Sequence, residues 1–223
     1  GKREQVVIST KVAKWVEQPG LSPVNIRQAV DGSVKRLQVD CIDLYQAHED
    51  DASVPMEETL GEFARLIEAG KVRVIGASNF RAGRLETALN VAREHRLPRY
   101  ECLQPEYHLL ARASYEAELE PLARKEGLGV LGYYALASGF LSGKYRRAAD
   151  FAKSAARGRA AQRYLNPRGL AVLAALDAVA AAQRATPAQV ALAWLMARPG
   201  FTAPITRATS VAPLDDLLGA VCF

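Results

Sequence analysis

Strand-like and helix-like segments alternate along this chain, and most of them are joined by short turns. Apolar runs rich in β-branched residues predict six strands, at residues 6–12, 41–48, 72–79, 101–107, 128–134 and 202–207. Amphipathic segments predict helices at residues 23–37, 56–69, 81–97, 114–126, 167–183 and 186–197, and Ser210 starts a last one. Such alternation is typical of a parallel sheet covered by helices.

Each predicted strand carries a polar side chain at or near its end: Lys11, His48, Asn79, Gln104, Tyr133 and Arg207. In a β/α barrel the carboxyl ends of the strands form one rim, and the active site lies there. An open doubly wound sheet instead gathers its functional residues at one switch point. The pattern favours an α/β fold, a (β/α)8 TIM barrel represented by about six of its eight β/α units. The six predicted strands are two short of a closed barrel, and we expect one domain over residues 1–223.

The composition is that of an ordinary globular protein. The chain has 223 residues, of which 49% are hydrophobic and 24% charged, so it can bury a sizeable core. A net charge of +5 and a pI of about 9.2 favour anionic partners. The basic residues are scattered and show no nucleic-acid-binding pattern, so a solvated surface or an anionic cofactor explains the excess better than nucleic acid does. No apolar run is long enough to span a bilayer, so no membrane partner is expected.

The three cysteines, Cys41, Cys102 and Cys222, show no metal-ligand spacing, and we expect no metal site. Cys41 and Cys102 lie in or beside apolar runs, as small core residues of a reducing, cytoplasmic compartment do. The first five residues do not resemble a secretory signal and look like the end of a helix, so further chain upstream is expected.

One connection, residues 135–167, is much longer than the others and ends in a basic stretch with Arg157, Arg159 and Arg163. A connection of this length in a compact domain is usually a functional lid or a mobile segment. We therefore expect it to cover a bound ligand.

Six short motifs follow one another in order: ISTK, DLYQAH, GKVRVIGASNF, LQPEY, LASGFLSGKY, and API followed by ATS. With these motifs the chain resembles the aldo-keto reductases. These are NAD(P)H-dependent (β/α)8-barrel enzymes that reduce aldehydes and ketones or run in reverse. The resemblance covers essentially the whole chain and is greatest to the bacterial branch that includes potassium-channel β subunits and stress-related reductases.

The catalytic set of that family is Asp, Tyr, Lys and His. The resemblance assigns the lysine to Lys11 and the histidine to His48. It places the Asp and Tyr after the second strand of the barrel. By the same resemblance the chain corresponds to the family from the third strand on and lacks the first two strands, so we expect the 223 residues alone to be inactive. Tyr45 and Tyr133 match other family positions and do not fill the gap. Without the resemblance, Lys11 also reads as a solvent-facing strand end and His48 as a residue that caps a loop.

The chemistry explains these residue types. Hydride transfer to a carbonyl carbon leaves a developing alkoxide that needs a proton. A tyrosine with its ordinary pKa near 10 is a poor acid at neutral pH, and a nearby ammonium such as that of Lys11 lowers this pKa. The imidazole of His48 can donate a hydrogen bond to the same oxygen and orient the substrate.

The resemblance also implies a dinucleotide site. Ser78, Asn79 and Gln104 match the residues that bind the nicotinamide carboxamide, whose donor and acceptor groups suit amide and hydroxyl side chains. Tyr133 matches the aromatic residue that stacks on the nicotinamide ring, with core packing as the alternative. The chain reads Gly-Tyr-Tyr-Ala from residue 132, where the family usually has Pro-Tyr-Ser-Pro.

Two further segments match the rest of the dinucleotide. The loop that embraces the pyrophosphate corresponds to Leu136, Ser138, Gly139, Leu141, Gly143 and Lys144, where glycine allows close approach and lysine supplies charge. The adenosine end corresponds to Arg207, Thr209, Pro213 and Asp216. Many NADPH-preferring members have arginine at the position of Thr209, and relatives have glutamine at that of Pro213. Arg207 and the positive net charge favour NADP(H), with NAD(H) as the alternative.

Two other functions stay open at this point. The first is a nucleotide-binding regulatory or assembly subunit like the channel β subunits, with little or no turnover. The second is a basic nucleic-acid-binding domain, which has little support. For an enzyme, the substrate is a small aldehyde or ketone, selected by Trp15, Tyr107, the segment after His48 and residues 135–167. Assembly into a homo-oligomer is also left open.

Overall fold

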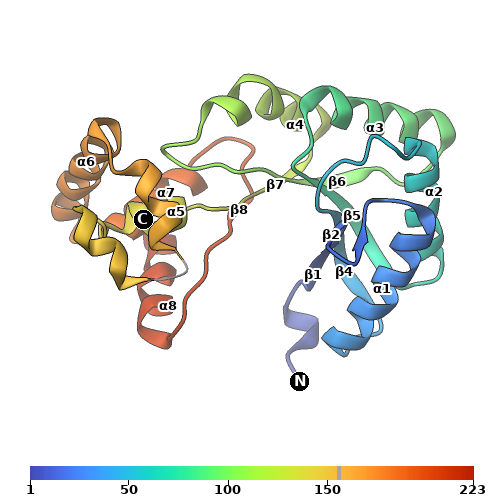
Figure 1. The fold of residues 1–223 in the computed structure, drawn as a ribbon, viewed down its shortest axis with the longest axis horizontal. Coiled ribbons are helices and arrows are strands. Elements are labelled where there is room, and N and C mark those ends of the chain that lie inside the picture. The colour runs from blue at the N-terminus through green and yellow to red at the C-terminus, as the bar shows by residue number, and fades with distance from the viewer. Residues whose placement is uncertain (155–156) are drawn as a thin grey trace. The chain divides into compact units, whose positions relative to one another are not determined.

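The computed structural model describes residues 1–154 and 157–223. The chain forms two compact units (Figure 1). The first comprises Gly1–Pro105 and Pro121–Gly129, and the second comprises Glu106–Glu120 and Val130–Phe223. Each unit is described by itself below.

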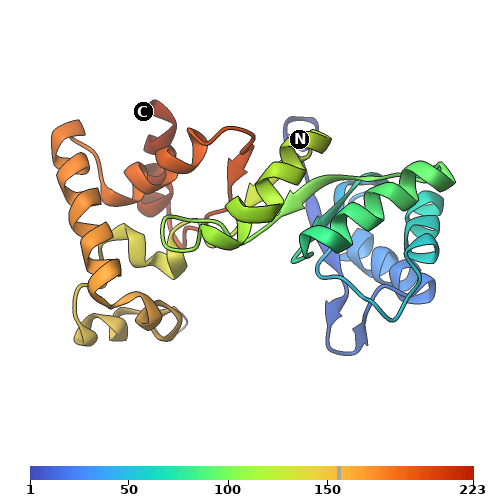
Figure 2. The ribbon, with the colours of Figure 1, turned by 90° about the horizontal axis from the view of Figure 1, so that it is seen from above.

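The first unit is a parallel sheet with the strand order β1-β4-β5-β6. These strands are β1 (Ser9–Val12), β4 (Ile42–Ala47), β5 (Val72–Ser78) and β6 (Tyr100–Gln104). Three helices lie along one face of the sheet (Figures 1 and 2): α1 (Pro23–Leu37), α2 (Met56–Glu68) and α3 (Ala82–His95). Edge-on aromatic contacts between Tyr45, Phe63 and Tyr100 join this face to the helices.

The helix starts and stops in this unit follow local signals. The hydroxyl of Ser22 accepts a hydrogen bond from the Asn25 N–H, and Pro23 is the first residue of α1. Just after α2, Gly70 has φ +70°, the left-handed conformation that glycine adopts without strain. The predictions for these helices are confirmed to within a residue or two.

The second unit contains β7 (Gly129–Gly132), except for its first residue, and β8 (Ala203–Pro204), which pair in parallel. It also contains three longer helices. These are α6 (Pro167–Gln183), α7 (Pro187–Met196) and α8 (Val211–Leu218). Between β7 and α6 lie four short helical turns in the described residues: Ala137–Ser142, Ala148–Lys153, α5 (Gly158–Ala161) and Gln162–Tyr164. A turn at Gly219–Cys222 follows α8.

Several predicted boundaries were wrong. The first strand starts at Ser9 rather than residue 6, because Val6 and Val7 follow a helical turn (Arg3–Gln5) and stay exposed. The last strand shrinks to Ala203–Pro204, since only these two residues pair with β7. The helix predicted at 114–126 begins as a π-helical stretch, Tyr115–Leu119, and continues as α4 (Glu120–Glu126). A hairpin of β2 (Lys14–Trp15) and β3 (Gln18–Pro19) was not predicted.

Residues 135–167 form the long connection expected from the sequence, and their role in covering a ligand stays a prediction. Where the structure describes them, they form helical turns whose apolar side chains enter a core with Leu173 and Leu176 of α6 and Ala191 of α7. Phe140, Leu141 and Tyr145 are fully buried there. The segment is therefore largely a packed part of the second unit, with residues 155–156 outside the described residues.

Strands and helices alternate as predicted, and six strands run parallel in the described residues. The fold class is therefore confirmed as α/β, with six β/α units of a (β/α)8 barrel. The organisation as one domain stays a prediction. Within the described residues, no helix alone is both long and apolar enough to cross a membrane, although a bent pair (Gly158–Tyr164 and Pro167–Gln183) meets the length and composition criteria together.

Candidate active site

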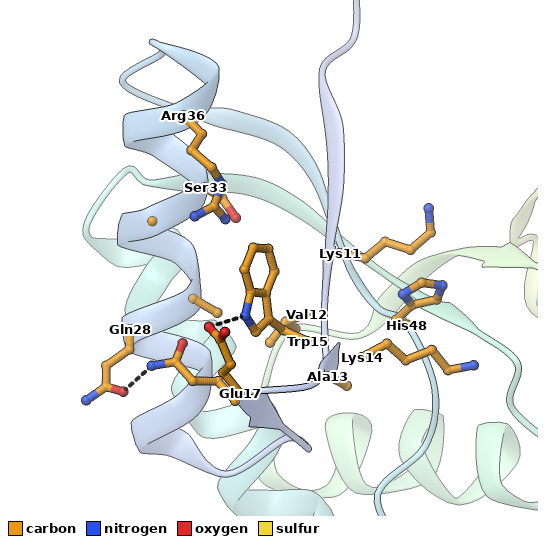
Figure 3. A pocket seen from close by; sticks show the side chains of 13 residues that line it. Lys11, Val12, Ala13, Lys14, Trp15, Glu17, Gln28, Ser33, Arg36 and His48 are labelled. Atoms are coloured by element: carbon orange, nitrogen blue, oxygen red, sulfur yellow. Dashed lines mark hydrogen bonds between the residues drawn. The ribbon is translucent and has the colours of Figure 1, made fainter.

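Neighbouring strands bring Lys11 and His48 together. In the register of β1 and β4, Lys11 lies opposite Gln46, and the His48 N–H donates to the Val12 carbonyl over 2.8 Å. Because side chains two residues apart share a face of a strand, Lys11, Gln46 and His48 lie on the same side of the sheet. Figure 3 shows the Lys11 and His48 side chains next to each other, extending to the same side of β1.

Burial shifts the pKa of both groups, and the charge of Lys11 also acts on His48. Burial lowers the pKa of Lys11. Burial also lowers the pKa of His48, and the positive charges of Lys11 and Lys14 lower it further. Within the described residues the Lys11 ammonium has no carboxylate within ion-pair distance. At pH 7 the site therefore pairs a half-buried lysine with a neutral imidazole.

The three carboxylates that follow the histidine are all engaged. Glu49 pairs with Lys14 at 3.0 Å, and Asp50 forms a two-pronged pair with Arg84 at 2.7 and 2.9 Å. Asp51 accepts from a backbone N–H that precedes α1 over 2.8 Å. Each carboxylate thus contacts a partner other than His48, and these contacts anchor the loop that follows β4.

Ser78, Asn79 and Gln104 form a polar network beside this pair. Ser78 and Gln104 lie opposite each other in β5 and β6, and the Ser78 hydroxyl donates to the Gln104 carbonyl over 2.9 Å. The Asn79 amide donates to the His48 carbonyl over 2.9 Å, with Asn79 at φ +57°, a conformation that asparagine tolerates. Five sequence-predicted site residues therefore occupy one edge of the first sheet.

Gln46 is a central residue of this network that sequence reasoning missed. Its side chain is completely buried, donates to the Ser9 hydroxyl over 2.8 Å and accepts from the Gln104 amide over 3.2 Å. A Cβ on the neighbouring Gly76 would lie 3.2 Å from the Gln46 side chain, so glycine makes room for it. The position of Gln46, two residues before His48 in a strand, was the signal that could have identified it.

Trp15 lines a cavity of about 470 Å³ with Lys11 and His48. The indole N–H donates to Glu17 over 2.9 Å, and the Arg36 guanidinium lies 5.1 Å from the indole ring centre. As Figure 3 shows, the ring lies between α1 and β1. Trp15 is therefore held in one orientation by a hydrogen bond and a cation–π contact.

The remaining predicted site residues lie in the second unit. Tyr133 follows β7, is half-buried and contacts the ring of Tyr134 edge-on at 5.1 Å, and burial raises its pKa. Ser138 and Gly139 have φ of +58° and +90°, which turns the backbone sharply inside the loop. Leu141 is fully buried and Leu136 packs against the same core.

Lys144 is the last of the predicted pyrophosphate-binding residues in this loop. Its ammonium lies 5.0 Å from the centre of the Tyr145 ring. A Cβ on Gly139 would lie 3.1 Å from the same ammonium, so the lysine side chain folds back over the glycine. Gly143, at φ +77°, precedes it. The lysine side chain thus lies against a loop glycine, and the role of this loop at a pyrophosphate stays a prediction.

The four residues matched to the adenosine end of the dinucleotide differ in exposure. Arg207, Thr209 and Pro213 are exposed. Asp216 is partly buried, and its carboxylate accepts from the Thr186 hydroxyl over 3.0 Å. Asp216 therefore already ties α8 to the start of α7.

The structure thus places a lysine and a histidine at adjacent strand ends of a parallel β/α fold. A family model described as "Aldo/keto reductase family" matches residues 1–223, and the chain belongs to that family. The relation to channel β subunits stays a prediction.

Three relatives show the range of similarity. Uncharacterized oxidoreductase YrpG of Bacillus subtilis is 36% identical over 99% of this chain and 68% of its own length. Probable aldo-keto reductase 1 of Glycine max is 32% identical over 98% and 63%. Aldo-keto reductase yakc of Schizosaccharomyces pombe, whose name includes NADP(+), is 32% identical over 99% and 66%. The chain thus spans about two thirds of the length of these relatives.

Proposed function

We propose that the protein is an NADP(H)-dependent oxidoreductase that transfers a hydride between the nicotinamide and the carbonyl carbon of an aldehyde or ketone. The observation that carries this proposal is the adjacency of Lys11 and His48 at the ends of β1 and β4, beside the network of Ser78, Asn79 and Gln104. Family membership and the oxidoreductase names of the relatives support it.

The donor groups fit a nicotinamide dinucleotide. Hydroxyl and amide side chains in the first unit suit the carboxamide, which both donates and accepts hydrogen bonds. In the second unit, an ammonium folded over a glycine loop suits a pyrophosphate. When bound, the nicotinamide supplies or accepts the hydride.

The protein's own residues then act on the carbonyl oxygen. His48, neutral at pH 7, can donate a hydrogen bond to that oxygen and orient the substrate. Lys11 supplies the positive charge that lowers the pKa of the proton-donating tyrosine of the family. The family resemblance assigns the proton to a tyrosine that is not among these residues. Tyr45 does not replace it, since its ring lies 6.0 Å from Phe63 on the helix-covered face of β4.

We therefore propose that a polypeptide of these 223 residues alone turns over carbonyl compounds poorly. Location in the cytoplasm, as for a protein with free thiols, stays a prediction. NADP(H) is favoured over NAD(H) by the exposed Arg207, the net positive charge and the name of the fission-yeast relative.

The test uses the protein as its gene encodes it. We expect carbonyl-dependent oxidation of NADPH on a panel of aldehydes and ketones. In a fluorescence titration we expect tighter binding of NADPH than of NADH. Tight NADPH binding without turnover on any of the carbonyl compounds would contradict the enzyme assignment, and a clear preference for NADH would contradict the cofactor assignment.

A further inference from the structure

The backbone on both sides of Lys144 is held by charged side chains outside the predicted cofactor-binding set. The Arg146 Nε donates to the Gly143 carbonyl over 2.8 Å. The Lys153 ammonium donates to the Lys144 carbonyl over 3.2 Å. Lys144 therefore sits in a short stretch whose two successive carbonyls both have side-chain donors.

Arg146 is itself fixed by helix α6. Its Nη1 and Nη2 donate to the two carboxylate oxygens of Asp177 over 2.6 and 2.7 Å. These hydrogen bonds lower the pKa of Asp177. A two-pronged pair of this kind fixes the plane of the guanidinium as well as its distance. The Nε that reaches Gly143 is thus oriented by a residue of α6, 31 positions away in sequence.

Gly143 allows this close approach. A Cβ at this position would lie 2.6 Å from the Arg146 Nη2, and the glycine has φ +77°. The guanidinium therefore lies directly over the glycine, one residue before Lys144. Any other side chain would push it away and strain the left-handed backbone.

Asp150 provides a second anchor. It is buried, accepts from the N–H groups of Arg146 (2.9 Å) and Arg147 (3.1 Å), and pairs with Lys153 at 2.9 Å. The backbone of residues 143–147 is thus held from both α6 and the turn at Ala148–Lys153.

We propose that the Asp177–Arg146 pair is a positioning device that presets Lys144 for the cofactor pyrophosphate. The inference rests on the proposed function. A lysine on a fixed backbone loses less freedom on binding than one on a mobile loop, so presetting strengthens binding. The pair touches no reacting group, and its effect passes through Lys144.

A simple electrostatic role makes the opposite prediction. If only charge mattered, Asp177→Asn would remove a negative charge near an anion site and tighten NADPH binding. Arg146→Lys would keep the charge and leave binding unchanged. Presetting predicts that both variants bind NADPH more weakly, because both lose the two-pronged pair.

The experiment measures the NADPH dissociation constant by fluorescence for the wild type and for Asp177→Asn, Arg146→Lys, Lys144→Met and Lys144→Met/Asp177→Asn. We expect Asp177→Asn and Arg146→Lys each to raise it about fivefold to tenfold, a coupling of ordinary size. For Asp177→Asn and Arg146→Lys, the kcat at saturating NADPH is expected to equal that of the wild type. In the Lys144→Met background, Asp177→Asn should add nothing. Asp31→Asn, which breaks the exposed pair with Lys71 in the first unit, is the matched control.

The outcomes separate this proposal from the one it rests on. Unchanged or tighter binding in Asp177→Asn, while Lys144→Met binds weakly, would overturn the positioning role alone. Additive losses in the double variant would also overturn it, since they mean that the pair acts independently of Lys144. If Lys144→Met itself binds NADPH normally, the assignment of this loop to the pyrophosphate falls, and the positioning role falls with it.

Discussion

The pairing of two strands brings Lys11 and His48 together. Each lies at the end of a strand, and the register of β1 with β4 makes them neighbours. Burial lowers both pKa values, and the lysine charge lowers that of the histidine further. Neutral imidazole beside a cation is suited to donating a hydrogen bond to a carbonyl oxygen.

Replacing either residue should affect chemistry more than cofactor binding. In the native gene product we expect Lys11→Met and His48→Ala to lower kcat by about a hundredfold or more, as loss of an acid–base group does. The NADPH dissociation constant should change by less than about threefold, because neither side chain is assigned to the cofactor. Steady-state kinetics and fluorescence titration measure the two effects. Lys71→Met, an exposed lysine outside the site, is the control, and equal losses of kcat and affinity would contradict the roles.

A second histidine, His108, is fully buried in the second unit. Its Nδ1 accepts from the Leu110 N–H at 3.2 Å, and its Nε2 lies 3.2 Å from the Tyr164 hydroxyl and 3.3 Å from Glu106. Because Nδ1 is an acceptor, the ring is neutral with its proton on Nε2. Burial lowers the pKa of His108, and the nearby Arg163 adds to this against the effect of Glu106.

This burial predicts acid sensitivity. The pKa of His108 is below its unfolded value of about 6.5, so between the two values the unfolded chain binds a proton that the folded chain does not. The free energy of unfolding should therefore fall as the pH drops from 7 through 6.5 towards the folded pKa. Urea unfolding at several pH values tests this. We expect His108→Gln to flatten the dependence, whereas His95→Gln, on the exposed end of α3, should not. Parallel pH profiles for the wild type and His108→Gln would argue against it.

At the scale of elements, helix starts were the most predictable feature. Thr186 caps α7: its hydroxyl accepts from the Gln189 N–H over 3.2 Å, and the Gln189 side chain accepts from the Thr186 N–H over 3.0 Å. The same hydroxyl donates to Asp216 of α8. One side chain thus both starts a helix and links it to the next.

Thr186→Ala should destabilise the second unit by about 1–2 kcal/mol, because it removes an N-cap and leaves Asp216 without its donor. Thr186→Ser keeps the hydroxyl and should restore most of the loss. The shift in the urea midpoint gives the measurement. Thr87→Ala is the control, since the Thr87 hydroxyl donates to the Gly83 carbonyl within the same helix, α3. A change no larger than that of Thr87→Ala would show that the cap contributes little.

Strand lengths and the loop at 135–167 were less predictable. Val6 and Val7 have high strand propensity but pair with no strand in the described residues, whereas Ser9–Val12 pair with β4. Propensity is local, but pairing depends on a partner elsewhere in the chain. The same holds for Phe140 and Tyr145, whose burial depends on α6 and α7.

For the whole molecule, the sequence alone determined the α/β class, the order of strands and helices, the family resemblance and most helix starts. These depend on periodicity, caps and turn residues, which act over a few positions. Only the tertiary structure decided that Gln46 links Ser9 to Gln104, and that Asp177 reaches back to Arg146. It also decided that the charge of Lys11 lowers the pKa of His48. Such contacts join residues about thirty or more positions apart, and local patterns do not reveal them because each depends on closing the long loop between its partners.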